Sequence, residues 1–210
     1  MRVAAGTWGG RTTEERRAER RKRLIDAATE IWGESGWAAV TMRGVCSRTS
    51  LNDRYFYEDF KDRDALLVAA WENARDEVFG EVSGVFVSNL HQPMLVTLRA
   101  AISAVVERTA SDTGRAQILL MHHVGSALQD HRAAALQQAT ELVLLAAQPH
   151  LRPGADETGL RMDTLVAVGG FVELISAWQS GLLDVDAQHI VDHTSRLAAT
   201  LSERYLRQDS

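Results

Sequence analysis

The chain has 210 residues, 45% of them hydrophobic, and a net charge of −5, which suits one extended domain or a small domain joined to a larger one. Its three prolines and short β-branched runs favour an all-α fold, and the single cysteine, Cys46, excludes an internal disulfide. No stretch has the pattern of a signal peptide or the roughly 20 apolar residues of a membrane span, so we expect a cytoplasmic protein with no membrane partner.

A first helix is predicted over residues 15–34. Its apolar side chains recur at helical spacing and form one stripe. The stripe consists of Leu24, Ile25, Ala28, Ile31 and Trp32. Gly36 follows where a residue with positive φ commonly ends a helix.

Two short helices separated by a tight turn are predicted next, between residues 41 and 60. Thr41 is a suitable N-cap for the first of them and Asn52 for the second, because their side-chain oxygens accept hydrogen bonds from backbone N–H groups of a first turn. In a helix-turn-helix the second helix enters the DNA major groove while the first crosses the backbone. The spacing therefore predicts a sequence-specific DNA-binding protein whose large remainder controls the binding.

The uneven charge agrees with this hypothesis. Residues 1–63 contain 13 Lys and Arg against 10 Asp and Glu, a net of +3, whereas residues 64–210 have a net of −8. Neutralisation of phosphates supplies most non-specific affinity for DNA, so the nucleic-acid surface is expected at the N-terminal end. Residues 1–13 are either part of that surface or a solvated basic tail.

The rest of the chain predicts six more helices, about nine in all. A long helix starts near residue 62 and reaches the region of Gly84, and Pro93 fits the first position of the next. Further helices are expected over residues 114–124, 130–148, 156–180 and 186–207. We therefore expect a three-helix DNA-binding domain with its N-terminal arm over residues 1–62, and a helical effector-binding and dimerisation domain over residues 63–210.

Residues from about 23 to 71 resemble the N-terminal domain of TetR-family transcriptional regulators. The matching positions are Gly36, Thr41, Val45, Tyr57, Phe60, Arg63, Leu66 and Leu67. Ser50 stands where the family usually has Gly in the turn, and Ser adopts positive φ less readily. Glu58 and Asp59 are also unusual: a carboxylate there would weaken phosphate binding, accept from cytosine N4, or pair with Arg54 inside the protein.

The resemblance implies seven DNA contacts: Thr41, Arg43, Asn52, Arg54, Tyr55, Tyr57 and Arg63. The hydroxyl of Thr41 is expected at a phosphate, and Arg43 at a phosphate or a nearby base edge. Asn52, Arg54 and Tyr55 are expected at base edges, with Arg54 suited to a bidentate guanine contact. Tyr57 and Arg63 are expected to bind the DNA backbone.

The resemblance also implies a homodimer that binds a palindromic operator, most simply as a repressor released by a mainly apolar small molecule. The last two helices would form the dimer interface, where Gly169 and Gly170 permit close approach of a partner; tight packing within one monomer is the alternative. The implied effector site among the middle helices comprises Leu98, Ile102, Leu119, His122, His123, Phe171, Glu173 and Trp178.

Two other functions remain open. His122, His123 and Glu173 could serve a metal-binding protein or a helical-bundle enzyme. However, adjacent helical residues point about 100° apart, and the sequence has no Gly-rich phosphate loop, nucleophile motif or HExxH arrangement, so neither an enzyme nor a cofactor is expected. A DNA-binding protein that responds to no ligand, and acts by dimer assembly alone, is the second possibility.

Overall fold

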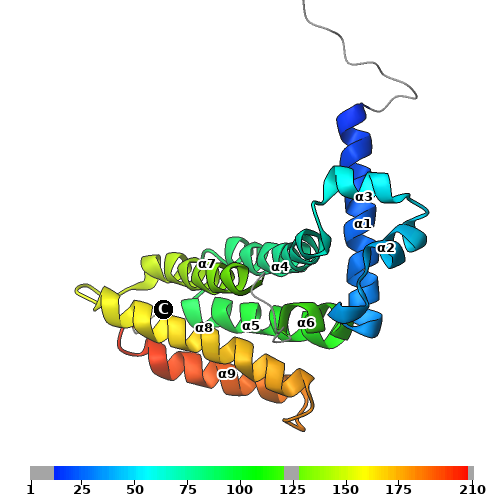
Figure 1. Ribbon diagram of the computed structural model, residues 1–210. Coiled ribbons are helices and arrows are strands. Elements are labelled where there is room, and N and C mark those ends of the chain that lie inside the picture. Colours follow the sequence, from blue (N-terminus) through cyan, green and yellow to red (C-terminus); the bar gives the residue numbers. More distant parts are fainter. Residues whose placement is uncertain (1–11, 121–127, 208–210) are drawn as a thin grey trace, which may run out of the picture. The chain divides into compact units, whose positions relative to one another are not determined.

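The computed structural model describes residues 12–120 and 128–207, and these contain nine α-helices and no β-strand (Figure 1). The all-α prediction is therefore confirmed. The chain forms two compact units, and the boundary between them lies between Asn73 and Ala74. This division falls inside helix α4 (Arg63–Ser88). The boundary after residue 62, between the DNA-binding domain and the effector-binding and dimerisation domain, stays a prediction.

The first unit contains α1 (Thr13–Ser35), the short 3-10 helix η1 (Trp37–Ala39), α2 (Met42–Thr49), α3 (Asp53–Asp59) and the start of α4. A capping box opens α1, in which the Thr12 hydroxyl accepts from the Glu15 amide while the Glu15 carboxylate accepts from the Thr12 amide. Gly36 ends the helix with φ of 81°, as predicted. The fully buried side chains of this unit include Leu24, Trp32, Val40, Val45, Phe56 and Leu66.

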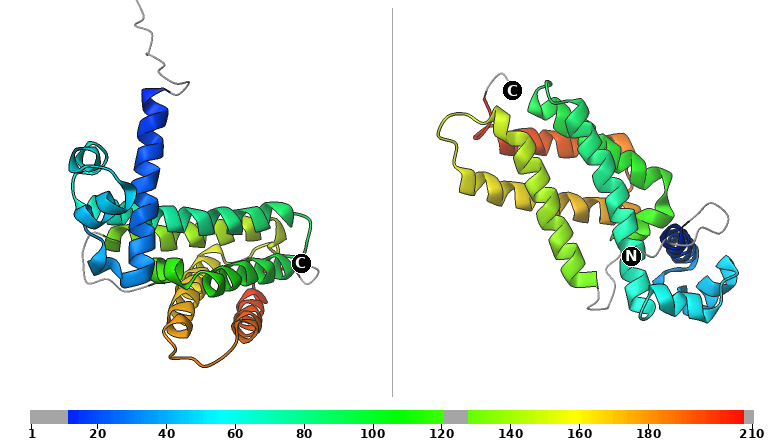
Figure 2. Two further views of the ribbon diagram at one scale, coloured as in Figure 1. Left: turned by 90° about the vertical axis from the view of Figure 1, so that its right-hand side faces the viewer. Right: turned by 90° about the horizontal axis from the view of Figure 1, so that it is seen from above.

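The second unit contains the rest of α4, then α5 (Met94–Ser111), α6 (Thr113–Leu120), α7 (Gln129–Ala147), the 3-10 helix η3 (Gln148–His150), α8 (Glu157–Gln179) and α9 (Ala187–Ser202). Helix α5 packs on α9, α7 packs on α8, and α8 and α9 run side by side (Figure 2). No helix of the described residues is long and apolar enough to cross a membrane.

One shared carboxylate joins three helices of the second unit. Glu77 of α4 pairs with both Arg108 of α5 and Arg115 of α6, and Arg108 also reaches Glu81 at 2.7 Å. These side chains are partly exposed, so each pair contributes little alone. Together they connect α4 to α5 and α6 soon after α4 enters this unit.

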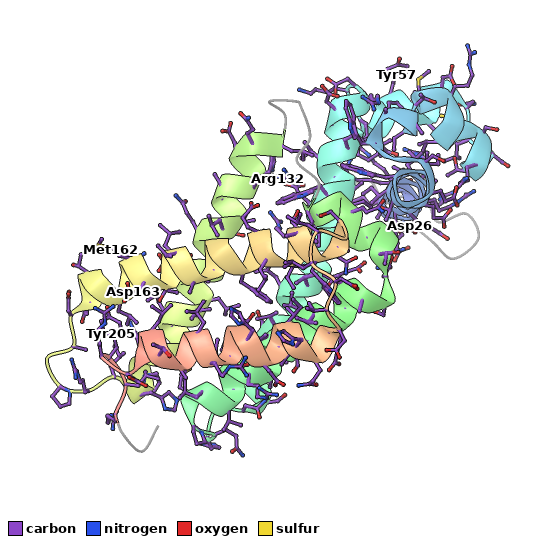
Figure 3. The ribbon with its side chains drawn as sticks, turned by 90° about the horizontal axis from the view of Figure 1, so that it is seen from below. Asp26, Tyr57, Arg132, Met162, Asp163 and Tyr205 are labelled. Carbon is purple, nitrogen blue, oxygen red and sulfur yellow. The ribbon has the colours of Figure 1, made fainter. Side chains whose placement is uncertain are left out.

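The end of the chain differs from the prediction. Helix α9 was expected to continue to about residue 207, but it ends at Ser202. The following residues return to the α7–α8 connection, where Leu206 forms an isolated bridge with Leu151 and the Arg207 amide donates to the His150 carbonyl at 3.0 Å. The Tyr205 hydroxyl donates to Asp163 at 2.7 Å (Figure 3). These long-range contacts favour leaving the helix, and helical periodicity alone does not reveal them.

Candidate nucleic-acid interface

The two predicted N-caps hold the helices of the motif in place. The Thr41 hydroxyl accepts from the Gly44 amide at 3.0 Å and begins α2. The Asn52 side-chain oxygen accepts from the Tyr55 amide at 3.2 Å and begins α3. The hydroxyl proton of Thr41 is not used by this cap, so it can still donate to an external acceptor.

The turn between α2 and α3 depends on Ser50, which has φ of 56° and ψ of 33°. Among the described residues, Ser50 is the only residue other than glycine that has a positive φ. The turn is closed by the Leu51 amide, which donates to the Cys46 carbonyl at 3.0 Å. Ser50 therefore adopts a left-handed conformation, which costs free energy for any residue with a Cβ atom.

Helix α3 has one buried side and one exposed side. Phe56 is buried, and its ring contacts those of Tyr57 and Phe60 at centroid distances of 5.5 and 5.8 Å. Arg54, Tyr55 and Tyr57 are exposed, and Tyr57 lies at the edge of the first unit (Figure 3). The helix thus offers a guanidinium and two phenols to an external partner.

The two acidic residues near the end of α3 are engaged inside the protein. Glu58 pairs with Arg54 at 3.0 Å and with Arg20 of α1 at 3.1 Å. Asp59 pairs with Arg20 at 2.8 Å and with Arg17 at 3.0 Å. Of the three alternatives drawn from the sequence, pairing with Arg54 is found for Glu58, whereas Asp59 pairs with the arginines of α1 instead.

Asp59 stays ionised at this position. Burial of its fully covered carboxylate raises its pKa, but the hydrogen bonds and charges of Arg20 and Arg17 outweigh that effect and lower the pKa below its ordinary value. The pKa of Arg20 is raised, mainly by its hydrogen bond to Asp59. A carboxylate at the C-terminal end of a helix is unfavourable beside the helix dipole, and the arginines of α1 compensate for it.

Several arginines of α1 are therefore paired within the protein. Arg21 donates to the Asp59 carbonyl at 2.7 Å and lies over the Phe60 ring, while Arg23 donates to the Thr49 carbonyl. Sequence reasoning missed these contacts by assigning this charge to DNA. The spacing of Arg17, Arg20 and Arg21 on one helical face, with two acids at the end of α3, was the available signal.

The two remaining predicted arginines differ in their surroundings. Arg63 donates to the carbonyls of Val40 and Trp37, and its guanidinium lies 5.0 Å from the centre of the Trp37 ring. These bonds tie the start of α4 to the α1–α2 connection. Arg43 is exposed, and within the described part of the first unit its guanidinium has no hydrogen bond or ion pair, which leaves it available to a phosphate.

Comparison with known proteins supports this geometry. The family model for bacterial regulatory proteins of the tetR family matches residues 24–70. Residues 24–70 are a TetR-family DNA-binding domain. No curated protein matches the chain in sequence. The turns of α1 that contain Arg17 and Arg20 precede the matched range.

Solved structures show that the TetR-like fold extends over most of the chain. FadR from Bacillus subtilis, in complex with stearoyl-CoA, is 16% identical with a TM-score of 0.63, over 87% of this chain and 97% of that one. SmeT in complex with triclosan is 22% identical with a TM-score of 0.64, over 90% and 93%. NalD, the secondary repressor of the MexAB-OprM multidrug efflux pump in Pseudomonas aeruginosa, is 16% identical with a TM-score of 0.62, over 92% and 99%. At these identities the likeness concerns the fold alone.

The predicted effector residues of this TetR-like chain do not all lie together. Ile102, Leu98, Phe171 and Trp178 share one apolar cluster of α5, α8 and α9, in which the Trp178 indole donates to the Val185 carbonyl at 2.7 Å. Leu119 instead lines a hollow of about 10 Å³ beside Arg108 and Arg115, room for about one water.

Of the polar residues of the predicted effector site, only Glu173 lies within the described residues. Glu173 is exposed on α8, and His122 and His123 lie outside the described residues. Arg132 of α7 is half-buried and donates to the Leu119 carbonyl at 3.3 Å. Burial lowers its pKa, and the charge of Glu173 opposes the shift. No group of three His, Cys, Asp or Glu among the described residues could hold a metal ion.

Proposed function

We propose that this protein is a cytoplasmic, ligand-responsive transcriptional regulator that binds a palindromic operator as a homodimer and acts as a repressor. The observation that supports it best is the exposed face of α3, which presents Arg54, Tyr55 and Tyr57 within a TetR-family DNA-binding domain. Arg54 reads a guanine, Tyr57 binds a phosphate, and Thr41 and Arg43 position α2 on the backbone. Asn52 and Tyr55 complete the set of residues that face the bases. Arg63, at the start of α4, contacts the DNA backbone.

The proposed dimer rests on the exposed apolar surface of α8 and α9. Val166 and Met162 are 71% and 63% exposed, and Leu165, Val172 and Leu197 are also exposed. A Cβ atom at Gly169 would meet only Leu136, at 4.0 Å, and one at Gly170 would meet nothing within 4 Å. Packing within the monomer therefore does not explain why two adjacent glycines occur here. A second copy of the chain packed against α8 would occupy the space beside them.

The effector proposal concerns a mainly apolar molecule bound in the second unit. The cluster around Ile102, Phe171 and Trp178 supplies apolar surface, and Arg132 and Glu173 of the same unit supply polar groups that set orientation. Stearoyl-CoA and triclosan, bound in two proteins of similar fold, both contain large apolar parts. An enzyme or metal site at His122, His123 and Glu173 finds no support in the described residues.

The experiment is an in vitro selection of random duplex DNA with the full chain, followed by binding measurements at several salt concentrations. We expect an enriched inverted repeat and an affinity that falls steeply with salt, because phosphate contacts release counterions. Selection of single half-sites would contradict the dimer, and no enrichment at low salt would contradict the whole proposal.

The response to an effector needs its own measurement. A thermal-shift screen with apolar small molecules should identify compounds that raise the melting temperature and release the selected operator. If compounds stabilise nothing while operator binding persists, the protein is instead a DNA-binding regulator that acts through dimer assembly alone.

A further inference from the structure

Glu58 lies between two arginines at the centre of a chain of ion pairs that runs from the surface of α3 into the first unit. One carboxylate oxygen accepts a hydrogen bond from Arg54 Nε at 3.0 Å, and the other forms an ion pair with Arg20 Nη2 at 3.1 Å. Arg20 Nε in turn donates to Asp59 at 2.8 Å. The exposed fraction of the side chains falls in the same order, from 84% for Arg54 to 38% for Glu58, 17% for Arg20 and 0% for Asp59.

This arrangement constrains the way Arg54 meets DNA. Because its Nε atom is used by Glu58, the bidentate fork formed by its two Nη nitrogens is left for an external acceptor pair. Guanine presents O6 and N7 as such a pair in the major groove. We propose that Glu58 is a positioning residue for base recognition, which holds the Arg54 fork in an end-on orientation. This inference rests on the proposed function, in which Arg54 reads a guanine.

The anchor on α1 makes this orientation effective. An ion pair between residues four apart on an exposed helix is weak and leaves both side chains mobile. Here Glu58 is also held by Arg20, and Arg20 is fixed by Asp59 and by the Tyr55 ring, whose centre lies 4.7 Å from its guanidinium carbon. The rotamers of Glu58 are therefore restricted before DNA binds, which reduces the entropy lost when Arg54 becomes ordered.

The same contacts argue against a direct role for Glu58 at a base. Both of its carboxylate oxygens are already paired with an arginine guanidinium. A contact with cytosine N4 would require breaking one of these pairs beside the negative DNA backbone. If Glu58 instead orients Arg54, both ion pairs remain as they are observed.

The test compares Glu58→Gln with Glu34→Gln in the full chain. Both substitutions remove one negative charge from the first unit, but Glu34 pairs with Arg48 at 2.8 Å and does not contact Arg54. Affinity is measured for non-specific duplex, for the selected operator, and for operators with the Arg54 base pair replaced. Arg54→Ala first identifies that base pair as the one whose discrimination, about five- to 150-fold for a bidentate contact, is lost.

Glu58→Gln is expected to lower discrimination at that base pair about two- to tenfold, the effect of leaving one side chain mobile. Its affinity for non-specific DNA should stay equal or rise, as for Glu34→Gln, because a negative charge has been removed. A purely structural defect would lower both affinities together. In the Arg54→Ala background, Glu58→Gln should change discrimination no further.

Two outcomes would overturn the inference, and they are distinguishable. If Arg54→Ala abolishes discrimination but Glu58→Gln leaves it intact, Glu58 does not position Arg54, and the proposed DNA-binding function stands. If Arg54→Ala changes affinity equally for all sequences, the base contact itself is wrong, and the inference fails with it. A fourth variant, Arg20→Lys, keeps the positive charge but not the two-pronged guanidinium; full discrimination in it would show that Arg20 does not hold Glu58 in place.

Discussion

Replacing Ser50 with glycine should stabilise the protein, although it removes a side chain. Ser50 occupies the left-handed region, with φ of 56° and ψ of 33°. Its side chain is exposed. The backbone bond that closes the turn, from the Leu51 amide to the Cys46 carbonyl, does not involve it. The substitution therefore removes strain without removing a stabilising contact.

The magnitude follows from two opposing effects. A residue with a Cβ atom costs about 1–2 kcal/mol in the left-handed conformation. Glycine loses more backbone entropy on folding, which offsets about 0.5–1 kcal/mol of that gain. The free energy of unfolding of the first unit should therefore rise by about 0.75 kcal/mol in Ser50→Gly, within a range of about 0–1.5 kcal/mol.

Amide hydrogen exchange of α1 and α2 measures this change in the first unit by itself, because it reports local opening. Ser47→Gly is the matched control, since Ser47 is an exposed serine inside α2. There glycine should lower the stability by about 0.5 kcal/mol, because it is the poorer helix former. If both variants are less stable than the parent, strain at Ser50 is not significant and the argument is refuted.

Further predictions concern DNA binding, assembly and pH. Arg54→Ala should cost about 1–3 kcal/mol at one base pair, whereas Tyr57→Phe should weaken binding to all sequences; equal, sequence-independent losses in fluorescence anisotropy would contradict this division. Leu197→Glu should convert dimer to monomer in sedimentation, because it places an unpaired charge in the proposed interface. Leu182→Glu, in the exposed α8–α9 connection, should leave the dimer intact. Asp59→Asn should lower stability by about 1.5–3 kcal/mol at neutral pH, because it weakens the charged hydrogen bonds from Arg20 and Arg17. Because the folded-state pKa of Asp59 is lowered, its contribution is present above the unfolded pKa of about 3.9 and disappears as the pH falls through the folded value. A difference between Asp59→Asn and parent that persists unchanged to pH 2 in urea titrations would contradict this reasoning.

The amino-acid sequence alone determines the local features of this protein. Helix periodicity and short-range caps, such as Thr41 at α2 and Asn52 at α3, depend on residues three or four positions apart, so their pattern is legible in the chain. The same local logic identified Ser50 as the turn position and the helix-turn-helix as the DNA-binding element. The structure confirms the two caps and the turn at Ser50, and the match to the family model supports the helix-turn-helix.

The tertiary structure decides how distant charges and chain ends are used. Arg20 and Asp59 are 39 residues apart, and nothing local shows that α1 crosses the end of α3 so that this arginine stabilises the protein rather than binding DNA. Tyr205 likewise leaves the helical pattern for Asp163, 42 residues away. Local hydrogen bonds set where a helix begins, whereas the partner of a long charged side chain depends on which helices pack together, and that is settled by burial of the apolar core.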